Sequence, residues 1–129
     1  MATTDKIKYF YDTYAIFEYV YGSPDYQRYF KPEIGITTRL NLMEFYYHYH
    51  LIDDEYAKEV YLSFLPICVD FTDEELFSAM KKRHEMRKKK RLKLSYIDAL
   101  GYTISLERGL IFLTGDEEFE NLEQVEYVK

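Results

Sequence analysis

Four acidic residues have the type and the placement to bind a divalent cation together: Asp12, Glu44, Asp98 and Asp116. Each stands where a β-forming run ends or where a helix is expected to turn toward the core. Clustered carboxylates repel one another and raise each other's pKa unless a cation lies between them. Mg²⁺ and Mn²⁺ prefer oxygen ligands, and such ions polarise phosphoryl oxygens and activate water. The four acids therefore predict a metal centre suited to hydrolysis of a nucleic-acid backbone.

Two of these acids follow predicted strands. Residues 6–11 are rich in β-forming side chains and lead directly into Asp12. Residues 110–113 are fully apolar, as in a strand covered on both faces, and lead through Thr114 to Asp116. In a parallel sheet, ligands bind outside the carboxyl ends of the strands, which is where both carboxylates are expected.

The other two acids belong to predicted helices that begin at the same edge. Residues 39–51 contain no Gly or Pro and predict a helix in which Glu44 replaces a core-facing residue. At helical spacing the line that includes this charge is Leu40, Glu44, Tyr47 and Leu51. Asp98 follows Ser95 by three positions, in the first turn of a helix that extends to residue 107 or 108.

Each acid also has a purely structural interpretation. Asp12 and Asp116 are of a residue type that commonly caps helical turns. Asp98 could complete a capping box at its helix start, and Glu44 could pair with Arg39. All four alternatives would have to hold together, and this requirement favours the metal centre.

Length and composition fit one globular domain, residues 1–129, with 47% hydrophobic and 31% charged residues. No apolar run approaches the ~18 residues of a membrane span, and the N-terminus lacks a signal pattern, so we expect a cytoplasmic protein. The lone cysteine, Cys68, excludes an internal disulfide and is expected in a buried strand position. The three histidines show no spacing typical of zinc ligands or of a partner for Cys68.

Strands and helices alternate along the chain, which predicts a parallel sheet with helices on both faces. The predicted strands are residues 6–11, 33–37, 67–71, 110–113 and 125–128. The predicted helices are residues 13–21, 25–30, 39–51 after a Thr38 cap, 53–65, a long helix opened by the capping box of residues 72–75, and 95–108.

Charge is distributed very unevenly. The chain carries a net charge of −6, but residues 81–93 hold nine Lys or Arg and one Glu, a charge of +8 that leaves −14 on the rest. Clustered basic residues attract phosphate backbones, so this segment is interpreted as a rim that holds RNA against the acidic pocket. A solvated helix end and a surface for an acidic partner protein are the alternatives. Most of the 15 Tyr and nine Phe are expected in the core, while some could stack on bases or form an interface.

Four segments resemble the PIN-domain nucleases, in particular the small VapC-type toxins of prokaryotes. In chain order these segments are residues 11–16, 41–44, 94–100 and 113–119. The resemblance implies an α/β fold, a three-layer α/β/α sandwich with a central parallel sheet, and an Mg²⁺- or Mn²⁺-dependent endoribonuclease. It also implies a homodimer and, for toxin members, an antitoxin peptide that lies over the site.

The resemblance assigns roles to individual residues. The positions that hold the metal are matched by Asp12, Glu44, Asp98 and Asp116. Thr114 matches a position that supports the site through its hydroxyl, and Asn41 matches a frequent polar position one helical turn before the acid. Tyr14 departs from the family pattern, which usually has a small hydroxyl residue there.

Three functional hypotheses follow. The first is a metal-dependent ribonuclease in which the four acids are ligands. The second is a PIN-like module that binds RNA or a partner protein without cutting, which the bulky Tyr14 suggests. The third is a phosphoryl-transfer enzyme with Asp12 as nucleophile. The absence of a second acid two residues after Asp12 argues against this hypothesis.

Overall fold

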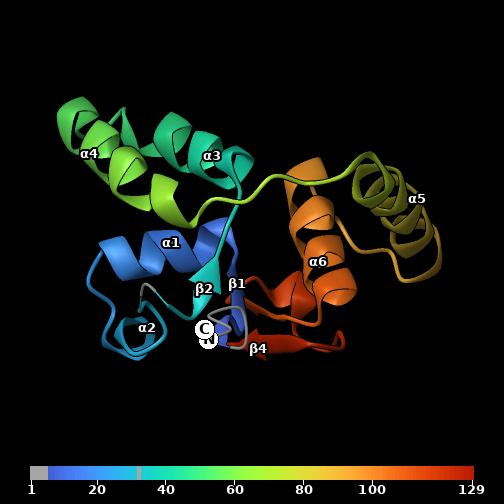
Figure 1. Ribbon diagram of the computed structural model, residues 1–129. Coiled ribbons are helices and arrows are strands. Elements are labelled where there is room, and N and C mark those ends of the chain that lie inside the picture. Colours follow the sequence, from blue (N-terminus) through green and yellow to red (C-terminus); the bar gives the residue numbers. More distant parts are fainter. Residues whose placement is uncertain (1–5, 32) are drawn as a thin grey trace.

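Four short parallel strands form the centre of the molecule, in the order β2-β1-β3-β4 (Figure 1). They are β1 Tyr9–Tyr11, β2 Gly35–Ile36, β3 Ile111–Thr114 and β4 Val125–Tyr127. The computed structural model describes residues 6–31 and 33–129. Residues 1–5, where no signal pattern is predicted, lie outside the described residues.

Helices cover both faces of this sheet (Figure 1). They are α1 Thr13–Val20, α2 Pro24–Gln27, α3 Arg39–Tyr49, α4 Asp54–Phe64, α5 Asp73–Lys89 and α6 Tyr96–Arg108, with 3₁₀ turns η2 Leu65–Ile67 and η3 Glu117–Phe119. The group α1, α3 and α4 lies on one side, and α5 with α6 lies on the other (Figure 1). The predicted three-layer α/β/α sandwich is confirmed. Within the described part of the chain, no helix is long and apolar enough to span a membrane.

The two faces of the sheet are separated by the alternation of side chains along its strands. Phe10 and Phe112 are paired in register, stack at a ring-centroid distance of 5.8 Å and pack with the helices α5 and α6. Tyr11 and Leu113 point to the opposite face, into the cluster formed with α1, α3 and α4. Gly101 lets α6 approach closely, since a Cβ there would lie 2.7 Å from Phe10 Cε1. Each face therefore has its own core.

Side-chain caps determine where the long helices begin. The Thr38 hydroxyl caps α3, and complete capping boxes open α5 with Thr72 and Glu75 and open α6 with Ser95 and Asp98. These caps satisfy amide groups that have no partner within the helix. The predicted starts of all three helices are therefore confirmed.

One predicted strand is wrong. Residues 67–71 do not form a strand of the sheet, because Leu65–Ile67 turn as η2 and only one parallel bridge joins Thr37 to Cys68. Pro66 lies in that turn and cannot donate a ladder hydrogen bond. Cys68 is accordingly half-buried rather than fully buried, and burial raises the pKa of its thiol.

The predicted core face of α3 is also wrong. Tyr47 and Leu51 are 63% and 75% exposed, while Leu42 and Phe45 are completely buried. The helix packs on α1 and α4 through a face rotated away from Glu44, so this acid lies at the flank of the helix. Aromatic residues of α3 itself lie on several of its faces, so their spacing alone did not identify the buried face.

Candidate active site

Asp12 lies at the carboxyl end of β1, and its side chain is only 2% exposed. Although it occupies the N-cap position of α1, its carboxylate makes no capping hydrogen bond. Oδ2 accepts a hydrogen bond from the Thr114 hydroxyl at 2.7 Å, whereas the buried Oδ1 has no partner among the described residues. A buried, unpartnered carboxylate oxygen is unfavourable, and a cation would satisfy it.

The other three acids act electrostatically on this region. Burial, followed by the charge of Asp98, raises the pKa of Asp12 well above its ordinary value, and Glu44 adds to the effect. Burial raises the pKa of Asp98 to about 6, with contributions from the charges of Glu44 and Asp116. Asp12 and Asp116 follow the carboxyl ends of the parallel neighbours β1 and β3, α3 begins after β2, and α6 ends just before β3 begins. The topology therefore brings the segments that carry all four acids to one edge of the sheet, which we call the acidic edge.

Thr114 connects two of the acids. Its hydroxyl donates to Asp12 and also accepts the Asp116 amide hydrogen at 3.1 Å. Asp116 in turn uses Oδ1 to accept the Glu118 amide hydrogen at 3.0 Å, which opens η3. The capping interpretation of Asp116 therefore holds for one oxygen, while the supporting role predicted for Thr114 has a direct geometric counterpart.

Asp98 likewise has one oxygen in a cap. Its Oδ2 accepts the Ser95 amide hydrogen at 3.0 Å, and the Ser95 hydroxyl accepts the Asp98 amide hydrogen at the same distance. Within residues 6–31 and 33–129, no three His, Cys, Asp or Glu side chains are arranged so that they could hold a metal ion together. Asp98 and Asp116 are held by their caps, and like charges repel, so without a cation the carboxylates do not converge on one point.

Glu44 and Asn41 occupy different surroundings on α3. Glu44 is partly exposed, and Arg39, its expected structural partner, donates instead to the Tyr61 hydroxyl at 3.0 Å. Asn41 is 1% exposed, accepts from Thr38 at 2.6 Å and donates to the Thr13 hydroxyl at 3.1 Å. Asn41 therefore ties the start of α3 to the residue next to Asp12.

Tyr14 lies against the turn that carries Asp116. A Cβ at Gly115 would lie 2.3 Å from Tyr14 Cε1 and 2.4 Å from the Val128 carbonyl oxygen, so only glycine fits between them. The Tyr14 ring is 6.4 Å from the ring of Tyr26, measured between centroids. The bulky ring thus packs beside the acidic edge.

Glu118 makes a contact beside the acidic edge that the sequence did not predict. Its carboxylate accepts the Lys93 amide hydrogen at 2.6 Å, which ties the basic segment to the turn after Asp116. The basic segment itself, residues 81–93, forms the second half of α5 and the loop before α6. Glu118 lies two residues after an acid of the site, but its contact joins positions 25 residues apart, which no local pattern indicates.

Comparison with protein families identifies the domain. The model of the PIN domain matches residues 9–125, which is nearly the whole chain. The chain belongs to the PIN-domain family. A comparison of this PIN domain with curated proteins finds no match.

Solved structures share the fold of this PIN domain. A chain of "DNA bound VapBC from Salmonella typhimurium" matches with a TM-score of 0.75 and 19% identity, over 95% of this chain and 97% of that one. A chain of VapBC2 from Rickettsia felis, bound to a promoter DNA fragment, gives 0.73 and 18%, over 94% and 98%. A toxin-antitoxin complex from Klebsiella pneumoniae gives 0.70 and 14%, over 92% and 96%. At these identities the likeness establishes a common fold.

The residues of this PIN domain fit a hard divalent cation. All four candidate ligands are carboxylates, without sulfur or imidazole, which suits Mg²⁺ or Mn²⁺. The caps leave one oxygen each on Asp98 and Asp116 outside the hydrogen bonds of the described residues. Together with the unpartnered Oδ1 of Asp12, these oxygens have the chemistry that such an ion requires, and a bound ion would have to draw them together.

Proposed function

We propose that this PIN-domain protein is an Mg²⁺- or Mn²⁺-dependent endoribonuclease whose metal is held by the four acids, Asp12, Glu44, Asp98 and Asp116. The observation that carries the proposal is the buried, unpartnered Oδ1 of Asp12, which lies within the electrostatic reach of Asp98 and Glu44. Its position at the carboxyl end of a parallel strand supports a ligand site. Membership of the PIN-domain family supports nuclease chemistry.

The side chains have distinct tasks in this proposal. When bound to these carboxylates, Mg²⁺ or Mn²⁺ would supply Lewis-acid chemistry, polarising the scissile phosphoryl group and lowering the pKa of water. Asp12, Asp98 and their neighbours act as ligands, and Thr114 fixes the orientation of Asp12 through the hydroxyl that donates to Oδ2. Asn41 supports the backbone beside Asp12 through Thr13. None of the carboxylates needs to attack phosphorus.

Substitution of single ligands tests the proposal. We expect Asp12→Asn and Asp98→Asn to abolish Mn²⁺-dependent cleavage of a labelled single-stranded RNA, because the amide keeps the shape but loses the charge. Circular dichroism should show an intact fold in both variants. Glu107→Gln is the matched control, since Glu107 is an exposed acid on the same helix as Asp98. Undiminished cleavage by Asp12→Asn would contradict the proposal.

A binding module that does not cut RNA is the second candidate, favoured by the Tyr14 ring beside Gly115. The two candidates differ in one measurement. Cleavage that appears with Mn²⁺, disappears with a chelator and is lost in Asp12→Asn eliminates the binding module. Binding of RNA without cleavage by the wild-type protein, under the same conditions, eliminates the nuclease.

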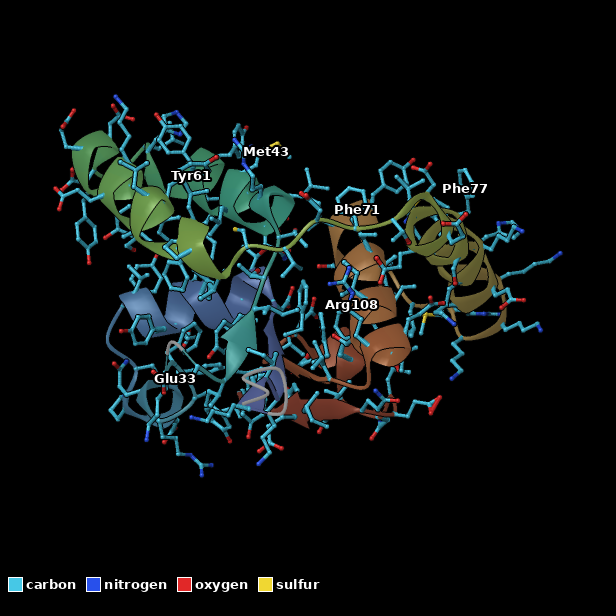
Figure 2. The ribbon with its side chains drawn as sticks, viewed as in Figure 1. Glu33, Met43, Tyr61, Phe71, Phe77 and Arg108 are labelled. Carbon is cyan, nitrogen blue, oxygen red and sulfur yellow. The ribbon has the colours of Figure 1, made fainter. Side chains whose placement is uncertain are left out.

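The protein is proposed to act as the toxin of a toxin-antitoxin pair and to form a homodimer. The similarity of its fold to chains of VapBC complexes supports this role. An apolar cavity of about 750 Å³ between α3 and α4, beside Met43 and Tyr61 (Figure 2), offers a surface for a partner protein. Co-purification with the product of a small adjacent gene, and loss of RNA cleavage in that complex, would be the expected result.

A further inference from the structure

A second pocket lies beside the acidic edge and is lined by basic side chains. Its volume is about 530 Å³, and its lining includes Arg83 and Arg87 of α5 and Arg91 and Lys93 of the loop before α6. Among the described residues, no Asp or Glu lines this pocket. Four cationic side chains around one cavity repel one another, and an anionic ligand would relieve that repulsion.

The guanidinium of Arg83 is held in place for this pocket. Its Nε donates to the Leu94 carbonyl at 2.8 Å, and its central carbon lies 4.5 Å from the centroid of the Tyr96 ring. An arginine fixed in this way loses little conformational entropy when it binds a phosphate. Tyr96 is 66% exposed, so the ring remains accessible for stacking beyond its contact with Arg83.

The loop between the basic pocket and the acidic edge is attached to both acid-bearing segments. The Lys93 amide donates to Glu118, and the Glu118 amide donates to Asp116. Ser95 lines the pocket and is also the capping partner of Asp98. Only a few residues of chain separate the basic pocket from the proposed metal ligands. A polynucleotide bound in the pocket therefore lies next to those ligands.

Arg91 has a backbone conformation that arginine rarely adopts. Its φ of 56° lies in the left-handed region, which Gly and Asn tolerate much better. The presence of a long cationic side chain at such a position is explained if the guanidinium has a binding role.

From these observations we infer that the pocket of Arg83, Arg87, Arg91 and Lys93, together with the Tyr96 ring, binds the strand of single-stranded RNA next to the scissile phosphate. The arginines contact two or more backbone phosphates, and one unpaired base stacks on Tyr96. The inference rests on the proposed function, because it identifies the substrate surface of the same site. Duplex RNA lacks unpaired bases and fits this surface less well.

Binding without cleavage tests this inference separately from catalysis. We would measure the affinity of a fluorescein-labelled RNA decamer of mixed sequence for the full chain in excess chelator, by anisotropy, across a salt series. Arg87→Glu should weaken binding about tenfold and reduce the slope of log affinity against log salt by about 0.7 per lost phosphate contact. Lys88→Glu, the same charge change one residue later and outside the pocket lining, should have a much smaller effect.

Two further variants separate stacking from charge and binding from folding. Tyr96→Ala should weaken binding roughly 5- to 150-fold, the range for loss of one stacked base, whereas Tyr96→Phe should bind like the wild type. Arg91→Asn should weaken binding while the melting temperature stays the same or rises, because Asn suits the left-handed backbone.

The outcomes distinguish this inference from the proposed function. Equal losses in Arg87→Glu and Lys88→Glu, or tighter binding of duplex RNA than of the single strand, would overturn the pocket even if the wild-type protein cuts RNA. Selective loss in Arg87→Glu and Tyr96→Ala would support the pocket even if no cleavage is detected. In a cleaving preparation, the same two variants should raise KM more than they lower kcat.

Discussion

Asp12 combines properties that are hard to reconcile in a protein without a cation. It is almost completely buried, and one of its oxygens is unpartnered among the described residues. Burial, followed by the charge of Asp98, raises its pKa. Its single side-chain hydrogen bond comes from Thr114. At the scale of residues, the site is therefore a set of carboxylates whose ionised forms a divalent ion would stabilise.

Thr114 should be needed for its hydroxyl rather than for its shape. In Thr114→Val the Asp12 carboxylate loses its donor, which should destabilise the protein by about 1–3 kcal/mol. The pKa of Asp12 should also rise further, because the Thr114 hydrogen bond lowers it. We expect cleavage to fall at least about tenfold, whereas Thr114→Ser should keep most of it. Urea unfolding and steady-state kinetics on both variants would check this; wild-type behaviour of the valine variant would exclude the role.

The metal-free protein should lose stability as the pH rises from about 4 to beyond 6. The pKa of Asp98 is raised to about 6 in the folded state, above the ~3.9 of an unfolded chain, so the folded state binds its proton more tightly. The free-energy cost of ionising Asp98 is absent below its pKa in the unfolded chain and complete above its pKa in the folded protein. This cost is expected to be about 3 kcal/mol.

The measurement is the melting temperature in chelator between pH 5 and pH 8. Wild-type protein should melt at a higher temperature at pH 5, and Asp98→Asn should have a flatter profile with a higher melting temperature at pH 8. The raised pKa of Asp12 acts in the same direction. A wild-type profile that rises toward pH 8 in chelator would show that the acids are not strained at this edge.

At the scale of elements, neighbouring residues determine where a helix begins, whereas contacts between distant segments determine how helices pack. The capping boxes of α5 and α6 each involve residues three positions apart. The α5 box was predicted, and the α6 box was considered as the structural alternative for Asp98. The ion pair that joins these helices connects Glu75 to Arg108, 33 positions apart. Arg108, labelled in Figure 2, also donates to the Asp70 carbonyl oxygen at 2.8 Å.

Removal of Glu75 should destabilise the contact between α5 and α6. Arg108 donates to both Glu75 oxygens at 2.9 Å, and Glu75 is 6% exposed, so Glu75→Gln leaves a partly buried arginine without its counter-charge. Because Arg108 keeps some solvent contact, the loss should be about 1–3 kcal/mol, less than for a fully buried pair. Lys58→Gln, which breaks an exposed pair with Asp54, should change stability much less. Similar losses in both variants would contradict this account.

The strand expected at residues 67–71 did not form, because strand formation depends on a pairing partner as well as on local composition. Its composition is typical of a strand, yet β2 beside it contains only Gly35–Ile36 and offers a very short edge. The chain makes one bridge at Cys68 and then passes the upper end of α6 on its way to α5 (Figure 1). Pairing with a neighbour decides whether a β-forming run becomes a strand, and that neighbour is distant in sequence.

At the scale of the whole molecule, the acidic edge and the basic pocket are adjacent parts of one surface. Ser95 belongs to both, and the loop that separates them is attached to Glu118. An acidic chain with a net charge of −6 would repel RNA in general, so in the proposed function the local cationic pocket would determine where the polymer approaches.

Binding of Mn²⁺ should stabilise the whole fold. At a free concentration about 100 times its Kd, the ion should raise the free energy of unfolding by about 2.7 kcal/mol, seen as a higher melting temperature at pH 7.5. Asp12→Asn should remove most of this gain, and Glu107→Gln should retain it. An equal shift in wild type and Asp12→Asn would place the ion elsewhere on the protein.

The sequence by itself determined the order of the helices and of the four strands that form, together with the starts of the long helices, because caps, turns and apolar runs are interactions among neighbouring residues. Only the tertiary structure decided which face of α3 is buried, that residues 67–71 make a single bridge, and that Asp12 Oδ1 lacks a partner while Asp98 and Asp116 cap their own turns. It also decided that Glu118 and Ser95 join the basic loop to the acids. These features depend on contacts between segments far apart in the chain, where packing and solvent exclusion determine the outcome.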